Sequence, residues 1–222
     1  MTLRIDWATP AAAEFACMHW HYSKCMPAFA SVRVGAWEQD RFIGVVMFSR
    51  GANLHIGEPY GLGQHEAVEL TRIALTEHQV PVSRILSITM RFLRQHCPGL
   101  RLLVSYADQA QGHHGGIYQA TGWIYVGTAT PQASLHVHGS LHHKRTLRER
   151  FGRGGNSIGW LREHVDPQAA WIEDKPKHKY LMPLDAAMRK QVLPLSCPYP
   201  KKDAEGYAPG LHQGQEANGG AA

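Results

Sequence analysis

The sequence predicts an α+β (mixed α/β) protein whose central, mostly antiparallel sheet is flanked by helices. Two apolar runs, at residues 32–37 and 41–48, are joined by three polar residues and predict a hairpin. A third, alternating strand at 66–75 precedes a helix over 81–96. A strand, a Gly/His-rich loop, a short helix and a strand then fill residues 100–126. A meander that feeds a crossover helix is typical of a mixed sheet.

Local signals support the elements of the first half. Thr9 and Pro10 are suited to the N-cap and first position of a helix over residues 8–19. A polar, glycine-rich stretch at 50–64 predicts a long functional loop. The helix over 81–96 carries its apolar residues at helical spacing and stops before a Pro-Gly pair.

The second half contains fewer regular patterns. We expect strands at 102–104, 135–138 and 179–184 and a basic helix at 144–151. The composition after residue 200 is rich in Gly, Ala, Gln and Pro and predicts a disordered tail. The predicted organisation is one catalytic domain over residues 1–200 and a tail over residues 201–222.

Composition narrows the class of protein. The 222 residues are 44% hydrophobic, and no apolar run approaches the roughly 18 residues of a membrane span. The four cysteines are scattered, with no CxxC pair, which favours a reducing compartment. We therefore expect a soluble, cytoplasmic protein with no membrane partner. A net charge of +5 favours a polyanionic partner, although many basic proteins bind no nucleic acid.

The segment around the buried strand at 102–104 carries candidate catalytic groups. Asp108 follows this strand, and Tyr118 comes ten residues later in a short helix. A carboxylate and a phenol are groups that general acid/base chemistry uses. The structural alternatives are that Asp108 caps a turn and that Tyr118 is a core aromatic.

Arg72 and Ser83 are candidate anion contacts. Arg72 lies on a central strand, where a charge needs a partner, which is either an anion or a nearby glutamate such as Glu69 or Glu66. Ser83 lies near a helix start, where it either caps the helix or contacts a phosphate.

His21 and Tyr22 open a proline-terminated loop and are expected in the wall of a site. With Cys17, His19 and Cys25, His21 also offers ligand types that hold zinc or iron, although not at the spacing of a standard finger. His136 and His138 alternate on a predicted strand and offer a weaker metal pair. Whether a metal is bound, iron included, is left open.

A basic run at residues 142–153 contains five Lys/Arg and one acid. A solvated helix face is one explanation, and a clamp on the DNA phosphate backbone is the other. The residues predicted to bind DNA are Lys144, Arg145, Arg148, Arg150 and Arg153.

The chain resembles the Mom family of phage DNA-modification proteins between residues 18 and 184. The motifs that carry the resemblance are HYSKCMP (21–27), GAWE (35–38), FIGVV (42–46), SRGAN (49–53), ELTRI (69–73), PVSR (81–84), SYAD (105–108), GHHGGIYQA (112–120) and WIY (123–125). The resemblance implies a fold like that of the GCN5-related N-acetyltransferases (GNAT), in which two splayed central strands admit an acyl donor. The order of the predicted elements agrees with that fold.

The resemblance also implies a function. Mom proteins convert adenine in duplex DNA to N6-(carbamoylmethyl)adenine, which protects phage DNA from host restriction enzymes, so the expected partner is double-stranded DNA in the host cytoplasm. By resemblance, the catalytic residues are His21, Tyr22, Asp108 and Tyr118, and Arg72 and Ser83 bind the donor. The adenine must be flipped out of the duplex to reach a pocket.

Two donors are left open. Acetyl-CoA with a redox metal such as iron is one, but residues 77–84 lack the glycines of the GNAT pyrophosphate loop. Glycyl-tRNA is the other, because the product, with N6 included, has the atoms of glycinamide; tRNA would then be a partner. The rival functions are an ordinary GNAT N-acetyltransferase for a protein or small amine, and a non-enzymatic DNA-binding protein. The oligomeric state is left open, a dimer included.

Overall fold

The computed structural model describes residues 2–27, 30–50, 54–109, 112–130, 133–142, 144–173 and 176–201. Its backbone contacts divide the chain into two compact units. The first unit comprises Met1–Ala107, His114–Gly127 and His178–Ala222, and the second comprises Asp108–His113 and Thr128–Lys177. The expected single domain over residues 1–200 stays a prediction. The expected tail, apart from Lys201, lies outside the described residues.

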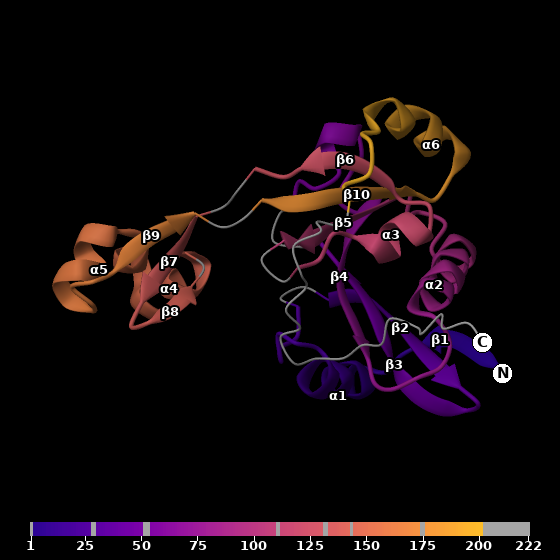
Figure 1. Ribbon diagram of the computed structural model, residues 1–222, viewed down its shortest axis with the longest axis horizontal. Helices are drawn as coiled ribbons and strands as arrows, with labels where there is room; N and C mark the ends of the chain where they lie inside the picture. Colours follow the sequence, from indigo (N-terminus) through magenta and orange to yellow (C-terminus); the bar gives the residue numbers. More distant parts are fainter. Residues whose placement is uncertain are drawn as a thin grey trace. The chain divides into compact units, whose positions relative to one another are not determined.

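A seven-stranded sheet of order β1-β2-β3-β4-β5-β10-β6 organises the first unit (Figure 1). Neighbours among β1 to β4 pair antiparallel, whereas β4 and β5 pair parallel. The predicted mixed, mostly antiparallel sheet is confirmed. The strands are β1 (Leu3–Trp7), β2 (Ala30–Glu38), β3 (Arg41–Ser49), β4 (Ala67–Leu75), β5 (Leu102–Asp108), β6 (Ile124–Thr128) and β10 (Lys177–Pro183).

Helices cover both faces of this sheet. Residues of α2 and α3 pack into the large core cluster with the apolar side chains of one face. Residues of α1 and α6 pack into two other clusters, α1 against β3 and β4 and α6 against β5 and β10. The helices are α1 (Pro10–Trp20), α2 (Val82–His96), α3 (Gly116–Ala120) and α6 (Ala186–Val192), with 3-10 turns at Glu58–Tyr60 and Leu193–Leu195.

The parallel pair β4 and β5 separates after a short stretch of pairing. Their register joins Ala67 to Leu102, Val68 to Leu103 and Glu69 to Val104, and within these two described strands the pairing goes no further. Just beyond, a register shift in the β3–β4 pairing follows Met47. The two central strands are therefore splayed, as the resemblance implies.

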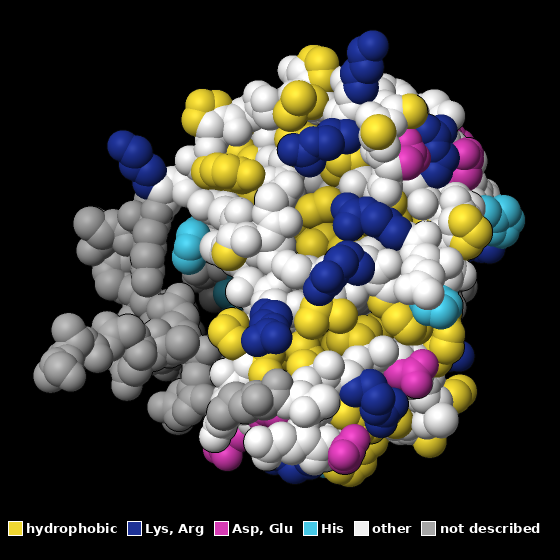
Figure 2. Space-filling view, turned by 90° about the vertical axis from the view of Figure 1, so that its right-hand side faces the viewer, with side chains coloured by type: hydrophobic (Ala, Val, Ile, Leu, Met, Phe, Trp, Pro, Cys, Tyr) yellow, Lys and Arg dark blue, Asp and Glu magenta, His cyan; other side chains and the backbone are white. Residues whose placement is uncertain are grey.

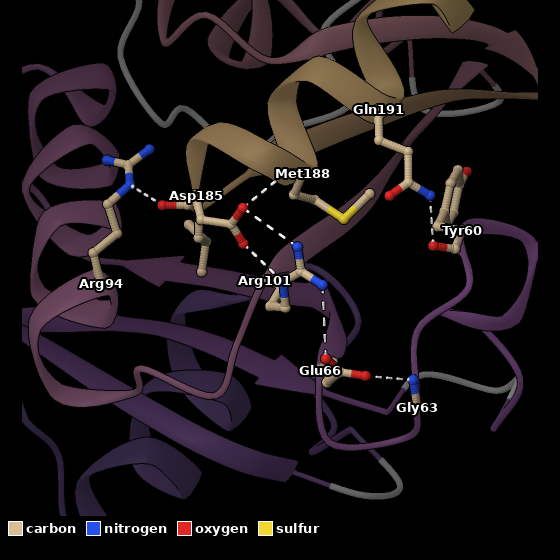
Figure 3. A network of polar contacts seen from close by, with 9 residues as sticks. Tyr60, Gly63, Glu66, Arg94, Arg101, Asp185, Met188 and Gln191 are labelled. Carbon is tan, nitrogen blue, oxygen red and sulfur yellow. Dashed lines mark hydrogen bonds and ion pairs between the residues drawn. The ribbon is translucent and has the colours of Figure 1, made fainter.

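A polar network fastens α6 to the sheet (Figure 3). Asp185 caps the helix by accepting the N–H of Met188 at 2.7 Å, and its other oxygen accepts Arg101 Nε at 2.9 Å. Arg101 also lies 3.9 Å from Glu66, which accepts the N–H of Gly63. One arginine thus joins α6 to the loop before β4.

The second unit has its own small sheet and core. Its three strands lie in the order β8-β7-β9, and Leu135, Leu147 and Leu161 are buried against them and two helices. The predicted basic helix is present with the expected bounds. The elements are β7 (Ala133–Val137), β8 (Ser140–His142), α4 (Lys144–Phe151), a 3-10 turn (Gly152–Asn156), α5 (Ile158–His164) and β9 (Ala170–Glu173).

The predicted strand at 135–138 begins two residues too late and ends one residue too late. β7 ends at Val137, and His138 and Gly139 have φ values of 48° and 75°. This is the geometry of a two-residue hairpin turn, so His136 and His138 do not alternate on one strand as expected.

Among the described helices, none is long and apolar enough to cross a bilayer.

Candidate functional site

The start of α3 is fixed by an aromatic contact in the first unit. Gly115 has a φ of 81°, and a Cβ there would collide with the ring of Tyr180. The Tyr180 hydroxyl donates to the carbonyl of His114 at 2.7 Å. Glycine is therefore required at this position, and the turn that leads to Tyr118 is held in place.

Tyr118 lies where β4 and β5 separate. Its ring is 5.1 Å from that of Trp123 and 5.0 Å from that of Tyr180. Its hydroxyl is 2.8 Å from Ser105 Oγ, which lies 3.2 Å from the carbonyl of Leu70. Ser105 and Leu70 follow the last residues that join the two strands. The phenol is thus aimed at the splay.

The environment of Tyr118 keeps its phenol protonated. Burial is the main reason that its pKa rises to about 12, and the charges of Glu69 and Tyr22 raise it further, against the hydrogen bond from Ser105. A phenol that stays neutral at physiological pH can give a proton to a leaving group. This is consistent with the expected acid role of Tyr118, which stays a prediction.

The loop that follows α1 presents His21 and Tyr22. His21 is 7% exposed, and its Nδ1 accepts the backbone N–H of Ser23 at 3.1 Å. Because that N–H can only donate, the neutral imidazole carries its proton on Nε2. Tyr22 packs on His21 with ring centroids 4.3 Å apart and is 49% exposed. An accessible aromatic ring therefore borders the site.

Arg72 ties this loop to β4. Its Nε donates to the carbonyl of Cys25 at 3.3 Å, and Nη1 donates to the carbonyl of Thr71 at 2.8 Å. Its Nη2 lies 3.6 Å from Cys25 Sγ. The pKa of the Cys25 thiol is lowered, first by its hydrogen bond with Ser23 and then by Arg72. The contacts give Arg72 a positioning role, and its donor contact stays a prediction.

Glu69 is a site residue that sequence reasoning considered only as an ion-pair partner. Its charge raises the pKa of Tyr118. The pKa of Tyr106 is raised to about 12, first by burial and then by the charge of Glu69. A carboxylate of β4 therefore acts on the phenol of Tyr118 and on a second phenol, that of Tyr106 on β5. The signals in the sequence were its place in the ELTRI motif (69–73) of the resemblance and its position three residues before Arg72.

Asp108 is the last residue of β5. Within the second unit, its Oδ2 lies 3.3 Å from Lys177 Nζ. The catalytic role expected of Asp108 stays a prediction.

Ser83 is the second residue of α2 and does not cap it. The cap position is held by Pro81, and no side chain accepts from the first turn. The N-cap alternative for Ser83 is therefore wrong, because the helix begins one residue before it. Its expected donor contact stays a prediction.

Coenzyme A is the cofactor that a GNAT-like fold implies, and the turn before α2 does not fit it. In that fold the backbone N–H groups of this turn hold the pyrophosphate. Here the N–H groups of Gln79 and Val80 donate to the carboxylate of Glu38. Two of the N–H groups ahead of α2 are therefore already bonded to a carboxylate.

The proposed Cys/His metal cluster is not formed. Cys17 is buried with its Sγ 3.2 Å from Met47 Sδ, and His19 bonds the carbonyl of Phe15. α1 continues to Trp20, so these side chains diverge around the helix. In the part of the chain that the structure describes, no group of three or more His, Cys, Asp or Glu side chains could hold a metal ion.

The basic helix α4 exposes most of its cations. Leu147 is buried, while Arg148, Arg150 and Arg153 are exposed. Lys144 Nζ lies 4.4 Å from the ring centroid of Trp171. The side chain of Arg145 lies outside the described residues. This arrangement suits either a solvated face or a phosphate contact, so the DNA-binding role stays a prediction.

The comparisons with known proteins decide the family. The model of the Mom protein family matches residues 2–201. The chain belongs to the Mom protein family. The resemblance to this family of phage DNA-modification proteins is thereby confirmed. The chain is also 24% identical over 188 residues to methylcarbamoylase mom of Escherichia phage Mu, covering 82% of this chain and 76% of that protein.

Solved structures are more distant from this Mom-family chain. The aminoglycoside acetyltransferase AAC(6′)-Ib, in complex with coenzyme A and kanamycin, has a TM-score of 0.47 at 8% identity, covering 86% of this chain and 99% of that one. YncA of Salmonella typhimurium, with acetyl-CoA, has a TM-score of 0.44 at 13% identity, covering 83% and 95%. These TM-scores are low, so the description of the fold depends on the strand order and the splayed pair.

Proposed function

We propose that this chain is a transferase that converts adenine in duplex DNA to N6-(carbamoylmethyl)adenine and so protects phage DNA from host restriction enzymes. The observation that carries the proposal is the protonated phenol of Tyr118 at the splay of β4 and β5, in a chain that belongs to the Mom family. The curated relative is named a methylcarbamoylase, which agrees with this product.

The chemistry needs one proton donor and one proton acceptor. Adenine N6 is a weak nucleophile, and it loses a proton when it attacks the carbonyl of an activated glycyl ester and expels the ester alcohol. The glycine amine then attacks C6 of the adenine and displaces the former N6, which becomes the amide nitrogen of the carbamoylmethyl group. We propose that Tyr118 protonates the leaving group, because its raised pKa keeps the phenol neutral. Asp108 remains our proposed acceptor, with Glu69 as the other carboxylate to test.

The remaining site residues suit the base and the donor. The chemistry at N6 requires a flipped adenine, and flipped bases are held by stacking and edge contacts. The half-exposed ring of Tyr22 and the Nε2 proton of His21 are proposed for these two contacts. Arg72 and Ser83 remain the proposed donor contacts, and Arg72 also holds the loop of His21 and Tyr22 in place.

Mass spectrometry of nucleosides from a co-expressed plasmid tests the function. With the wild-type protein we expect a deoxyadenosine that is heavier by the carbamoylmethyl group. Asp108→Ala should abolish this modified deoxyadenosine. Glu69→Gln tests whether Glu69, in place of Asp108, is the proton acceptor. Circular dichroism confirms that each variant is folded.

Unmodified adenine beside folded, soluble wild-type protein would contradict the proposal. It would favour the ordinary N-acetyltransferase, which predicts coenzyme A binding and no effect of DNA. Restriction protection that disappears after the protein is stripped from the DNA would instead favour a non-enzymatic DNA-binding protein.

A further inference from the structure

A buried carboxylate lies beneath the turn that connects β4 to α2. Glu38, at the end of β2, is 7% exposed. Its Oε1 accepts the N–H of Val80 at 2.8 Å and that of Gln79 at 3.1 Å, and its Oε2 lies 3.2 Å from the Gln79 nitrogen. The next residue is Pro81, which has no N–H to offer. Glu38 therefore occupies consecutive donors of this turn.

The Glu38 carboxylate is negatively charged at neutral pH. Burial acts to raise its pKa, but the hydrogen bonds from Val80 and Gln79 and the charges of His78 and Arg41 lower it overall. Backbone N–H groups ahead of a helix attract anions. In this chain the anion is supplied by a neighbouring strand.

The β2–β3 hairpin fixes Glu38 in this position. Gln39 and Asp40 have φ values of 50° and 63°, so a tight two-residue turn puts Glu38 opposite Arg41. Arg41 Nη2 donates to the carbonyl of Glu77 at 2.7 Å. The hairpin therefore bonds the turn before α2 through both a carboxylate and a guanidinium.

The surface around Glu38 is unfavourable to a diphosphate. An open groove of about 540 Å³ is lined by Glu38, Gln39, Arg41, Glu77, His78 and Gln79. Two carboxylates line the groove together with one guanidinium and the imidazole of His78, and the guanidinium is bonded to the turn. A bound diphosphate would meet like charge and bonded N–H groups.

We propose that Glu38 is a built-in anion that occupies the phosphate position ahead of α2 and excludes diphosphate-bearing donors, coenzyme A thioesters among them. This inference rests on the proposed function for the existence of an activated donor. With Glu38 in this position, the enzyme would accept an activated donor that has no diphosphate to place at this turn, such as an aminoacyl ester of RNA. Glu38 is then a specificity-determining residue.

Calorimetric titration of coenzyme A and of inorganic pyrophosphate into the full chain tests the proposal. The wild type should show no saturable binding at millimolar ligand. Glu38→Ala, which frees the N–H groups, should bind either ligand at least about tenfold more tightly. Glu77→Gln removes one charge from the same groove without freeing them and should show no gain. Glu38→Gln keeps an acceptor oxygen and should gain less than Glu38→Ala.

Micromolar binding of coenzyme A by the wild type would overturn the proposal. A folded Glu38→Ala variant that binds neither ligand more tightly than the wild type would overturn it too. If Glu38→Ala fails to fold, the same comparison is made with Glu38→Gln, and no gain in affinity there would overturn the proposal. Nucleoside mass spectrometry on the same wild-type protein keeps this result separate from the function. Unmodified DNA contradicts the proposed function and leaves the coenzyme A result standing.

Discussion

At the scale of single residues, burial keeps the phenol of Tyr118 protonated, which suits the proton-donor role that we propose for it. Tyr118→Phe keeps the ring between Trp123 and Tyr180 and removes only the hydroxyl that bonds Ser105. We expect the rate of adenine modification to fall by about 100-fold or more, the usual contribution of a general acid. The rate is measured by nucleoside mass spectrometry over time.

Tyr125→Phe is the matched control for this prediction. The Tyr125 hydroxyl lies 3.0 Å from His178 Nδ1, so its loss removes a phenol of the same core without affecting Ser105. An unchanged rate in Tyr118→Phe would show that its hydroxyl moves no proton in the reaction.

A second residue-scale prediction concerns Cys25. Its lowered pKa gives more thiolate at neutral pH, and the thiolate is the form that alkylates. We expect iodoacetamide to modify Cys25 faster than Cys197, which is also exposed. Ser23→Ala should slow the reaction at Cys25 alone. Peptide mass spectrometry measures both rates, and equal rates at the two cysteines would contradict the prediction.

At the scale of elements, α6 depends on the cap that Asp185 provides. Asp185→Ala removes this cap, and we expect it to lower the free energy of unfolding by about 1 kcal/mol. Arg101→Gln tests the other interaction of the same carboxylate. Urea unfolding at neutral pH measures both, and an unchanged midpoint for Asp185→Ala would contradict the prediction.

The same network predicts a dependence on pH. The pKa of Asp185 is lowered, first by the hydrogen bond from Arg101. A lowered pKa in the folded state stabilises the protein above the ordinary value of about 3.9, and this contribution is lost as the pH falls toward the folded value. Asp185→Asn keeps the cap oxygen without the charge. Its stability deficit should be present at neutral pH and absent in strong acid, and a deficit that grows in acid would contradict this.

At the scale of the whole molecule, two exposed sets of Lys and Arg side chains are alternative candidates for the proposed DNA-binding surface. One is on α4 and includes Arg148 and Arg150. The other is on α2, where Arg84 and Arg91 are exposed. Figure 2 shows the side of the molecule that carries α2, with Lys and Arg side chains spread across it and acidic side chains toward its edges.

The salt dependence of DNA binding separates the two sets. If α4 holds the backbone, Arg148→Gln with Arg150→Gln should flatten the slope of log affinity against log salt by about 0.9 for each phosphate that the protein no longer neutralises. Arg84→Gln with Arg91→Gln should leave that slope unchanged. The opposite result would move the DNA-binding role from α4 to α2.

Local signals predicted many of the elements. Thr9 accepts the N–H of Ala12 as an N-cap should, and the bounds of α4 are as predicted. The sequence did not predict β1, β8, β9, α5 or α6, which have between 3 and 7 residues each. Periodicity is weak over so few residues, and such elements are stabilised by tertiary packing.

The sequence predicted the types of residue in the candidate site better than it predicted how those residues are placed in space. Tyr118 was chosen for its chemistry, but its bond to Ser105 depends on a strand splay that no local pattern encodes. Glu69 was interpreted as an ion-pair partner because its influence on two phenols depends on distance through space. The supposed metal ligands around Cys17 failed for the same reason, since sequence spacing does not fix direction around a helix.

The sequence by itself determined the Mom resemblance, the mixed sheet and the presence of a phenol and carboxylates for proton transfer, because motifs and periodicity are properties of neighbouring residues. Only the tertiary structure decided that Tyr118 is buried at the splay and that Glu38 bonds Gln79 and Val80. Glu38 and Val80 are 42 residues apart, and only the pairing of β2, β3 and β4 brings them together. Burial and hydrogen bonding between distant segments set the pKa of each group, and they arise only when the chain folds.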